Sequence, residues 1–194
     1  MNVTAATKKP KRQNTAFKHL MILHWIMAAF IPSLYITGVF VAHPLRVSLL
    51  AWLVPFLHQS LGMLFLMLLI ARIFLLLRLF GHKYSRRSPK VTSTWLQLII
   101  LHSSLYFFML IVPVSGFFLR NFIGLDTTFL GIPVPSVFAS SETWIDLARS
   151  SHFWLSYIFL VFILLHVLAH WKIVWINVRK RFIYVAKAFF MEEE

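Results

Sequence analysis

The stretch that decides the fold is SHFWLSYIFLVFILLHVLAHWK, residues 151–172. It is long and apolar enough for a transmembrane helix, which needs about 20 such residues to cross the hydrocarbon core of a bilayer. Similar runs occur three more times, and the predicted spans are 20–42, 51–77, 96–119 and 152–176. These runs are continuously apolar, which favours helices over the alternating pattern of a membrane β-barrel. The sequence therefore predicts an all-α integral membrane protein, a four-helix bundle.

The composition supports a membrane protein and narrows the redox chemistry that it could carry. Of 194 residues, 59% are hydrophobic and only six are acidic, which leaves too little polar surface for a soluble domain of this length. The chain has no cysteine. Disulfides, iron–sulfur clusters, thiolate zinc sites and the covalent attachment of c-type haem are therefore excluded. A redox metal would have to be held by histidine, methionine or the few carboxylates.

Basic residues lie in three clusters at the expected membrane borders. The chain carries 19 Lys and Arg against 6 Asp and Glu, a formal net charge of +13. The clusters precede the first span, connect the second and third spans, and follow the fourth span, so the positive-inside rule predicts that both termini are cytoplasmic. Because the charge is confined to these borders, we expect it to contact anionic headgroups of the lipid bilayer, and nucleic acid is not an expected partner.

The expected domain organisation follows from these spans and clusters. A basic cytoplasmic tail at 1–18 precedes a four-helix membrane domain at 19–178, and a second cytoplasmic tail occupies 179–194. Residues 120–151 form the one long connection on the outer side, where a mixture of apolar and turn residues predicts a cap folded onto the bundle. No internal repeat is evident in the sequence.

Histidines inside the apolar spans are the candidate functional residues, because ionisable groups are costly in a bilayer. His152 and His166 are fourteen positions apart, close to four helical turns, so they share one face about 21 Å apart along the axis. His58 opens the second span near the outer surface, level with His152. His24 lies early in the first span near the inner surface, level with His166. The predicted pairs are therefore His58 with His152 outside, and His24 with His166 inside.

Two imidazoles facing each other across a helical bundle can ligate a haem iron from both sides. Two such haems at two depths would form an electron path across the membrane. Arg72 lies fourteen positions after His58, on the same face and at the inner level, and the predicted spans contain no Asp or Glu. A propionate of the inner haem is the anion that we expect this guanidinium to meet. The alternative is that Arg72 reaches the cytoplasmic border together with Arg78.

Each histidine taken alone also fits a structural role, as a hydrogen-bond donor to a carbonyl or a serine of a neighbouring helix. His170 lies eighteen positions after His152 and shares its face, which makes it the second candidate for the inner ligand. His102, early in the third span, has no evident partner at its level. It fits a contact with a quinone or a propionate, or plain packing between helices.

Several short motifs together resemble the prokaryotic cytochrome b561 family, over residues of about 17–175. The motifs are LHW (Leu23–Trp25), LHQSLG (57–62) followed by Arg72, LHSSLYFFMLIVPVSG (101–116), FLGIPVP (129–135) and HFWLSYIFLVFILLH (152–166). The resemblance implies that His24, His58, His152 and His166 are the axial ligands of two b-type haems (protohaem IX). The run HVLAHWK (166–172) departs from the family's usual continuation, which leaves the choice between His166 and His170 open.

The resemblance also implies a function: electron transfer between a donor and the quinone pool, in a bacterial plasma membrane or, in a photosynthetic organism, a thylakoid. One alternative keeps the haems but makes the chain the membrane anchor of a dehydrogenase or hydrogenase complex. A second alternative is a non-redox helical membrane protein with structural histidines. The sequence leaves open the electron donor, the oligomeric state, and whether the protein is an enzyme, a quinone oxidoreductase, or only a carrier.

Overall fold

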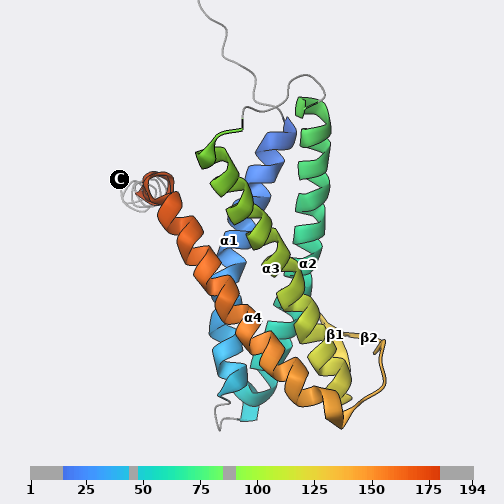
Figure 1. Cartoon of the computed structure of the whole chain (residues 1–194). Helices are drawn as coiled ribbons and strands as arrows, with labels where there is room; N and C mark the ends of the chain where they lie inside the picture. Colours follow the sequence, from blue (N-terminus) through green and yellow to red (C-terminus); the bar gives the residue numbers. More distant parts are fainter. Residues whose placement is uncertain (1–14, 44–47, 85–90, 180–194) are drawn as a thin grey trace, which may run out of the picture. The chain divides into compact units, whose positions relative to one another are not determined.

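The computed structural model describes residues 15–43, 48–84 and 91–179 (Figure 1). Within these ranges the chain forms four helices and one short β-hairpin. Their bounds are α1 Thr15–Ala42, α2 Ser48–Tyr84, α3 Ser93–Ile123, β1 Thr127–Phe129, β2 Ile132–Val134 and α4 Glu142–Ala169. All four helices are long and apolar enough to cross a membrane. The predicted all-α membrane fold is confirmed, whereas residues 1–14 and 180–194 of the predicted tails lie outside the described ranges.

The chain divides into two compact units, each built on a pair of antiparallel helices. The first unit holds α1 and α2 together with residues Thr128–Val134, and the second holds α3, α4 and the remaining connection. We describe the two units separately below and call them the first and the second hairpin unit.

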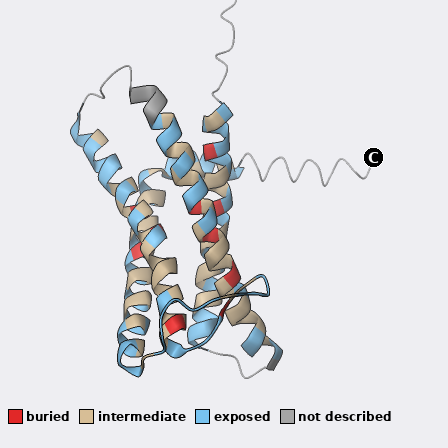
Figure 2. Cartoon of the chain, turned by 90° about the vertical axis from the view of Figure 1, so that its right-hand side faces the viewer, coloured by how far each residue is buried: buried red, intermediate tan, exposed pale blue. Residues whose placement is uncertain are grey.

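In the first hairpin unit, α1 and α2 pack along their length. The best-shielded side chains at this contact include Met27 of α1 and Leu69 of α2, which are 1% and 0% exposed. Most other apolar side chains stay exposed, and Figure 2 shows that buried positions are few on every helix. Lipid solvates such apolar side chains, so helices associate in a membrane through close packing and interhelical hydrogen bonds. The polar contacts between α1 and α2 therefore help to hold these two helices together.

In the second hairpin unit, α3 packs against α4 through aromatic rings. Phe108 of α3 stacks on Phe159 and Phe162 of α4, with ring centroids 6.4 and 5.2 Å apart. α3 begins where the Thr92 side chain accepts a hydrogen bond from the Trp95 backbone N–H at 3.2 Å. It ends at Gly124, whose φ of 76° is the left-handed conformation that glycine adopts at low cost.

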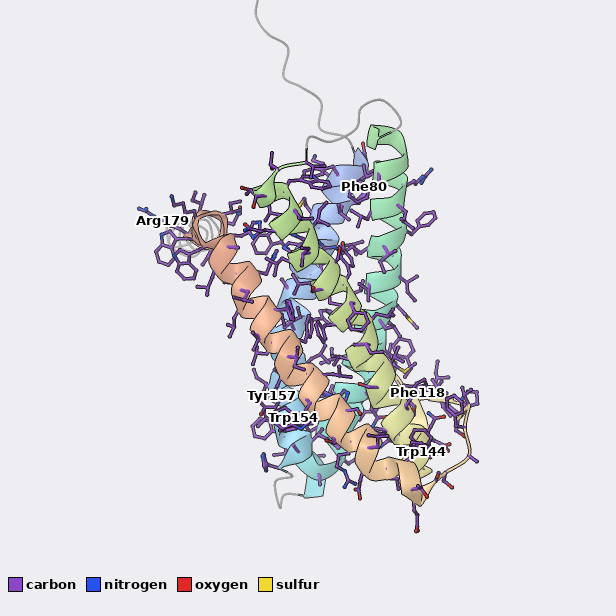
Figure 3. The ribbon with its side chains drawn as sticks, viewed as in Figure 1. Phe80, Phe118, Trp144, Trp154, Tyr157 and Arg179 are labelled. Carbon is purple, nitrogen blue, oxygen red and sulfur yellow. The ribbon has the colours of Figure 1, made fainter. Side chains whose placement is uncertain are left out.

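The fourth helix differs from the predicted span 152–176 at both ends. α4 begins ten residues earlier, at Glu142. Its first turns carry polar side chains, so the length of the apolar run did not include them. It ends at Ala169 because His170 leaves the helical conformation (φ −114°, ψ 17°), and residues 171–179 form further helical turns in a new direction (Figure 1). Arg179 closes this turned segment, while Trp154 and Tyr157 project from the middle of α4 (Figure 3).

The long connection between α3 and α4 packs onto helices in both units. In the first unit, the backbone N–H groups of Thr128 and Leu130 donate to Gln59 Oε1 and Ser60 Oγ of α2, at 3.4 and 3.2 Å. In the second unit, Asn121 Oδ1 accepts hydrogen bonds from the backbone N–H groups of Val137 and Phe138, at 2.6 and 3.3 Å.

The expected packing of this segment is thus observed, but the segment contains a β-hairpin that the sequence analysis did not predict. Leu130 and Gly131 at its turn have φ of 51° and 88°. Two consecutive positive φ values are typical of a two-residue turn whose twist matches the strands, which explains the hairpin.

Candidate functional site

His58, the first of the predicted ligands in the first hairpin unit, is held by a threonine of the opposite helix. Its Nδ1 lies 3.0 Å from Thr37 Oγ1. The same hydroxyl lies 2.8 Å from the Ser33 carbonyl and 3.1 Å from the Leu34 carbonyl, both on its own helix. A hydroxyl has one proton, so Thr37 donates it to a carbonyl and accepts from the imidazole. This pattern assigns the proton of His58 to Nδ1 and leaves the lone pair on Nε2.

Gly38 follows Thr37 and allows the His58 ring to come this close. A Cβ at Gly38 would stand 3.2 Å from His58 Cε1, tighter than ordinary van der Waals contact. Any larger residue would move the ring or the helix. The glycine and the hydroxyl therefore act on the same imidazole from adjacent positions of α1.

His152 is held in the same way in the second hairpin unit. Its Nδ1 lies 3.0 Å from Ser115 Oγ and 3.1 Å from the Val112 carbonyl, both on α3. Ser115 Oγ in turn donates to the Val112 carbonyl at 2.8 Å. A Cβ at the next residue, Gly116, would stand 3.0 Å from His152 Cε1. His152 therefore also carries its proton on Nδ1 and its lone pair on Nε2.

His24 meets the arginine that the sequence analysis placed at its level. Arg72 Nη1 of α2 lies 2.8 Å from His24 Nδ1 of α1. A guanidinium only donates hydrogen bonds, so in this arrangement Nδ1 of His24 is the acceptor. Arg72 is half-buried and Arg78 is exposed.

His166 belongs to a cluster of three imidazoles with His102 and His170. The ring centroids of His166 and His170 are 4.7 Å apart, and the His102 ring lies edge-on to both, at 5.1 and 5.7 Å. His102 Nδ1 lies 2.6 Å from the Leu98 carbonyl, and His170 Nδ1 lies 3.1 Å from the His166 carbonyl. The expectation that His102 has no partner at its level was therefore wrong, because α3 places it beside His166.

In the described ranges no group of three His, Cys, Asp or Glu side chains is arranged to hold a metal ion. Haem is held by single imidazoles, so the hydrogen bonds of each histidine ring decide whether it could ligate haem.

His58 and His152 have the hydrogen-bonding state that a haem-ligating histidine would need. Iron binds the lone pair of one imidazole nitrogen, and a hydrogen bond from the other nitrogen fixes the tautomer and the ring orientation. His58 and His152 meet this requirement, with Nδ1–H bonded and Nε2 carrying the lone pair. His24 does not meet it in this structure, because Arg72 donates to Nδ1, whereas ligation through Nε2 requires the proton on Nδ1.

The family described as prokaryotic cytochrome b561 matches residues 18–183. The chain belongs to that family. The resemblance that the motifs predicted is thus confirmed, and the cytochrome is a membrane protein that binds haem b and transfers electrons. A comparison with curated proteins found no match.

Two residues that contact the His58 and His152 rings through their hydroxyls were not identified from the sequence: Thr37 and Ser115. A spacing signal was nevertheless present in the cytochrome. Fourteen positions separate His24 from Gly38 in α1 and His102 from Gly116 in α3. The same spacing separates His58 from Arg72 in α2 and His152 from His166 in α4.

The two hairpin units thus share one arrangement of four positions. The first helix carries a histidine and, fourteen positions later, a glycine that meets the histidine of the second helix. The connection between α3 and α4 is longer than that between α1 and α2 because it contains the β-hairpin. This difference in length hides the repeated arrangement from a search for internal sequence repeats.

Proposed function

We propose that the cytochrome carries two b-type haems and exchanges electrons with a quinone of the bacterial plasma membrane. His58 and His152 would ligate the outer haem, and His24 and His166 the inner haem. The observation that carries the proposal is the matched state of His58 and His152, each with Nδ1 bonded to a hydroxyl and its lone pair on Nε2. A single structural histidine could make such a bond, but its occurrence on two helices, each time beside a glycine, supports a shared role as ligands.

The ligand set decides the kind of redox chemistry. When bound, haem supplies one-electron oxidation and reduction. Two imidazoles per iron leave no axial position for oxygen or substrate, which suits electron transfer. The fourteen-residue spacing of His152 and His166 corresponds to about 21 Å along α4, so the chain would hold its two haems at separate depths.

Arg72 completes the inner site in this proposal. Its guanidinium is a half-buried cation on a helix whose apolar stretch, 49–80, contains no carboxylate. A haem propionate is the anion that would draw it away from His24 Nδ1 and restore the tautomer that ligation requires. Arg72 would then let His24 carry its proton on Nδ1, and its positive charge would balance the negative charge of the propionate.

A quinone is the proposed partner because it is the mobile redox carrier that dissolves in the apolar phase of the bilayer. It would supply the proton-coupled part of the chemistry, while the haems supply the path. We assign no residue of the chain to the quinone. If the cytochrome instead anchors a dehydrogenase or hydrogenase, it will purify with that partner and its flavin, molybdenum or nickel.

Haem stoichiometry tests the proposal directly. Pyridine extraction of the purified cytochrome should give two protohaems per chain. His58→Ala and His152→Ala should each remove the same haem, identified by its reduction potential, and His24→Ala and His166→Ala should each remove the other. One haem per wild-type chain, or removal of different haems by His58→Ala and His152→Ala, would contradict the pairing.

A further inference from the structure

Two hydroxyl–glycine pairs occupy equivalent places in the two hairpin units. Thr37–Gly38 in α1 contacts His58, and Ser115–Gly116 in α3 contacts His152. We propose that Thr37 and Ser115 are positioning residues that set the reduction potential of the outer haem, by holding the Nδ1 proton of both its ligands. This inference rests on the proposed function, and goes beyond it by assigning residues that do not touch the iron.

The first step of the argument is the direction of the hydrogen bonds. Each hydroxyl lies 2.8 Å from a backbone carbonyl of its own helix, that of Ser33 for Thr37 and that of Val112 for Ser115. The carbonyl can only accept, so it takes the hydroxyl proton. The hydroxyl oxygen is then an acceptor aimed at the imidazole, 3.0 Å from Nδ1 in both units.

The second step is the role of the glycines. A Cβ would stand 3.2 Å from His58 Cε1 at Gly38, and 3.0 Å from Cε1 and 3.3 Å from Nδ1 of His152 at Gly116. The absence of a side chain at these positions lets each ring approach the helix backbone closely enough to reach the hydroxyl. The glycine lets the ring approach and the hydroxyl accepts its hydrogen bond, so the two residues of each pair act together on one imidazole.

The third step is the effect on the metal. An acceptor on Nδ1–H draws the proton away from the ring, which makes Nε2 a stronger donor to iron. A stronger donor stabilises the ferric state more than the ferrous state, so the hydroxyl lowers the reduction potential. Both ligands of the outer haem would carry this hydrogen bond, so their effects would act in the same direction.

The fourth step is selectivity between the two haems. At the inner level, Nδ1 of the proposed ligand His24 faces the Arg72 guanidinium, which is a donor and not a hydroxyl acceptor. Removing a hydroxyl at the outer level should therefore change one potential and leave the other in place. A general loosening of the fold would change both.

Thr37→Val tests the proposal in the full-length cytochrome, because valine keeps the shape of threonine and removes the hydroxyl. We expect two haems per chain, a shift of one potential to a more positive value, and a change in the low-spin ferric signal of that haem in electron paramagnetic resonance. The haem that shifts should be the one that His58→Ala removes. Thr37→Ser, which keeps the hydroxyl, should retain the wild-type potential.

Ser33→Ala is the matched control. Ser33 lies one turn before Thr37 in α1, and its hydroxyl donates to the Ala29 carbonyl. This variant should leave both potentials unchanged. If Thr37→Val loses the outer haem, retention of that haem in Thr37→Ser supports the proposal, and its loss in both variants overturns it. Unchanged potentials and an unchanged resonance signal in a two-haem Thr37→Val variant also overturn it.

Ser115→Ala provides the independent test in the second unit. The Val112 carbonyl, 3.1 Å from His152 Nδ1, remains as an acceptor, so the tautomer and both haems should be retained. We expect a positive shift of the same potential that Thr37→Val moves. A shift of the other haem would overturn the proposal. A wild-type protein with fewer than two haems would instead contradict the proposed function, so the two failures can be told apart.

Discussion

At the scale of single residues, Arg72 is the charged side chain that meets a proposed haem ligand. It lies half-buried in α2, and its Nη1 meets His24 Nδ1 at 2.8 Å. Its guanidinium therefore brings a positive charge to His24. A positive charge near a haem favours the reduced state, because reduction lowers the charge on the iron.

Arg72→Leu should therefore lower the reduction potential of the inner haem and leave the outer one nearly unchanged. At an effective dielectric constant of about 20, the lost interaction is on the order of 1–3 kcal/mol. Redox titration of the purified variant measures the shift, and Arg72→Lys, which keeps the charge, serves as the control. An inner potential that does not move in Arg72→Leu would argue against any contact between this charge and the haem.

At the scale of helices, the register of each antiparallel pair explains why histidines occur at two levels. In the first hairpin unit, α1 meets α2 at His24 with Arg72 and again at Thr37 with His58. In the second unit, the corresponding contacts join His102 to His166 and Ser115 to His152. Interhelical hydrogen bonds in membranes contribute modestly, about 0.6 kcal/mol each on average. The hydrogen bonds among these contacts therefore add little to stability by themselves.

The end of α4 bears on the choice between His166 and His170. His166 lies in the last turn of α4, fourteen positions after His152, whereas His170 lies outside the helix, at its C-terminal cap. We expect His166→Ala to lose the inner haem and His170→Ala to keep both. Haem content and the optical spectrum of the two purified variants measure this, and the opposite result would assign the inner iron to His170.

At the scale of the whole molecule, the features of the sequence and of the helices indicate how the protein lies in a bilayer. α4 has 28 residues, about 42 Å at 1.5 Å per residue, enough to cross the hydrocarbon core and both headgroup regions. Trp144 lies in its first turns, and Trp171 and Trp175 follow its end, where their rings stack 6.1 Å apart. Tryptophan at both ends of a span is typical of the two membrane interfaces.

The absence of cysteine makes the predicted orientation simple to measure, because single cysteines can be labelled without background. Thr15→Cys at the start of α1 and Ser136→Cys after β2 are both at exposed positions. In cells whose outer membrane alone is permeabilised, a membrane-impermeant maleimide should label Ser136→Cys. It should label Thr15→Cys only after the inner membrane is opened. The reverse pattern would place both termini outside.

The sequence by itself determined the four membrane-length helices, the family and the four ligand candidates. These depend on local properties: the length of an apolar run, the helical period that puts His152 and His166 on one face, and short motifs around single histidines. The contacts of Thr37, Ser115 and the glycines, the neighbours of His102 and the ends of α4 were decided only by the tertiary structure. Each depends on which helix packs beside which, in which register, and on how a ring is turned. Such facts arise from residues far apart in the chain, so no local pattern encodes them.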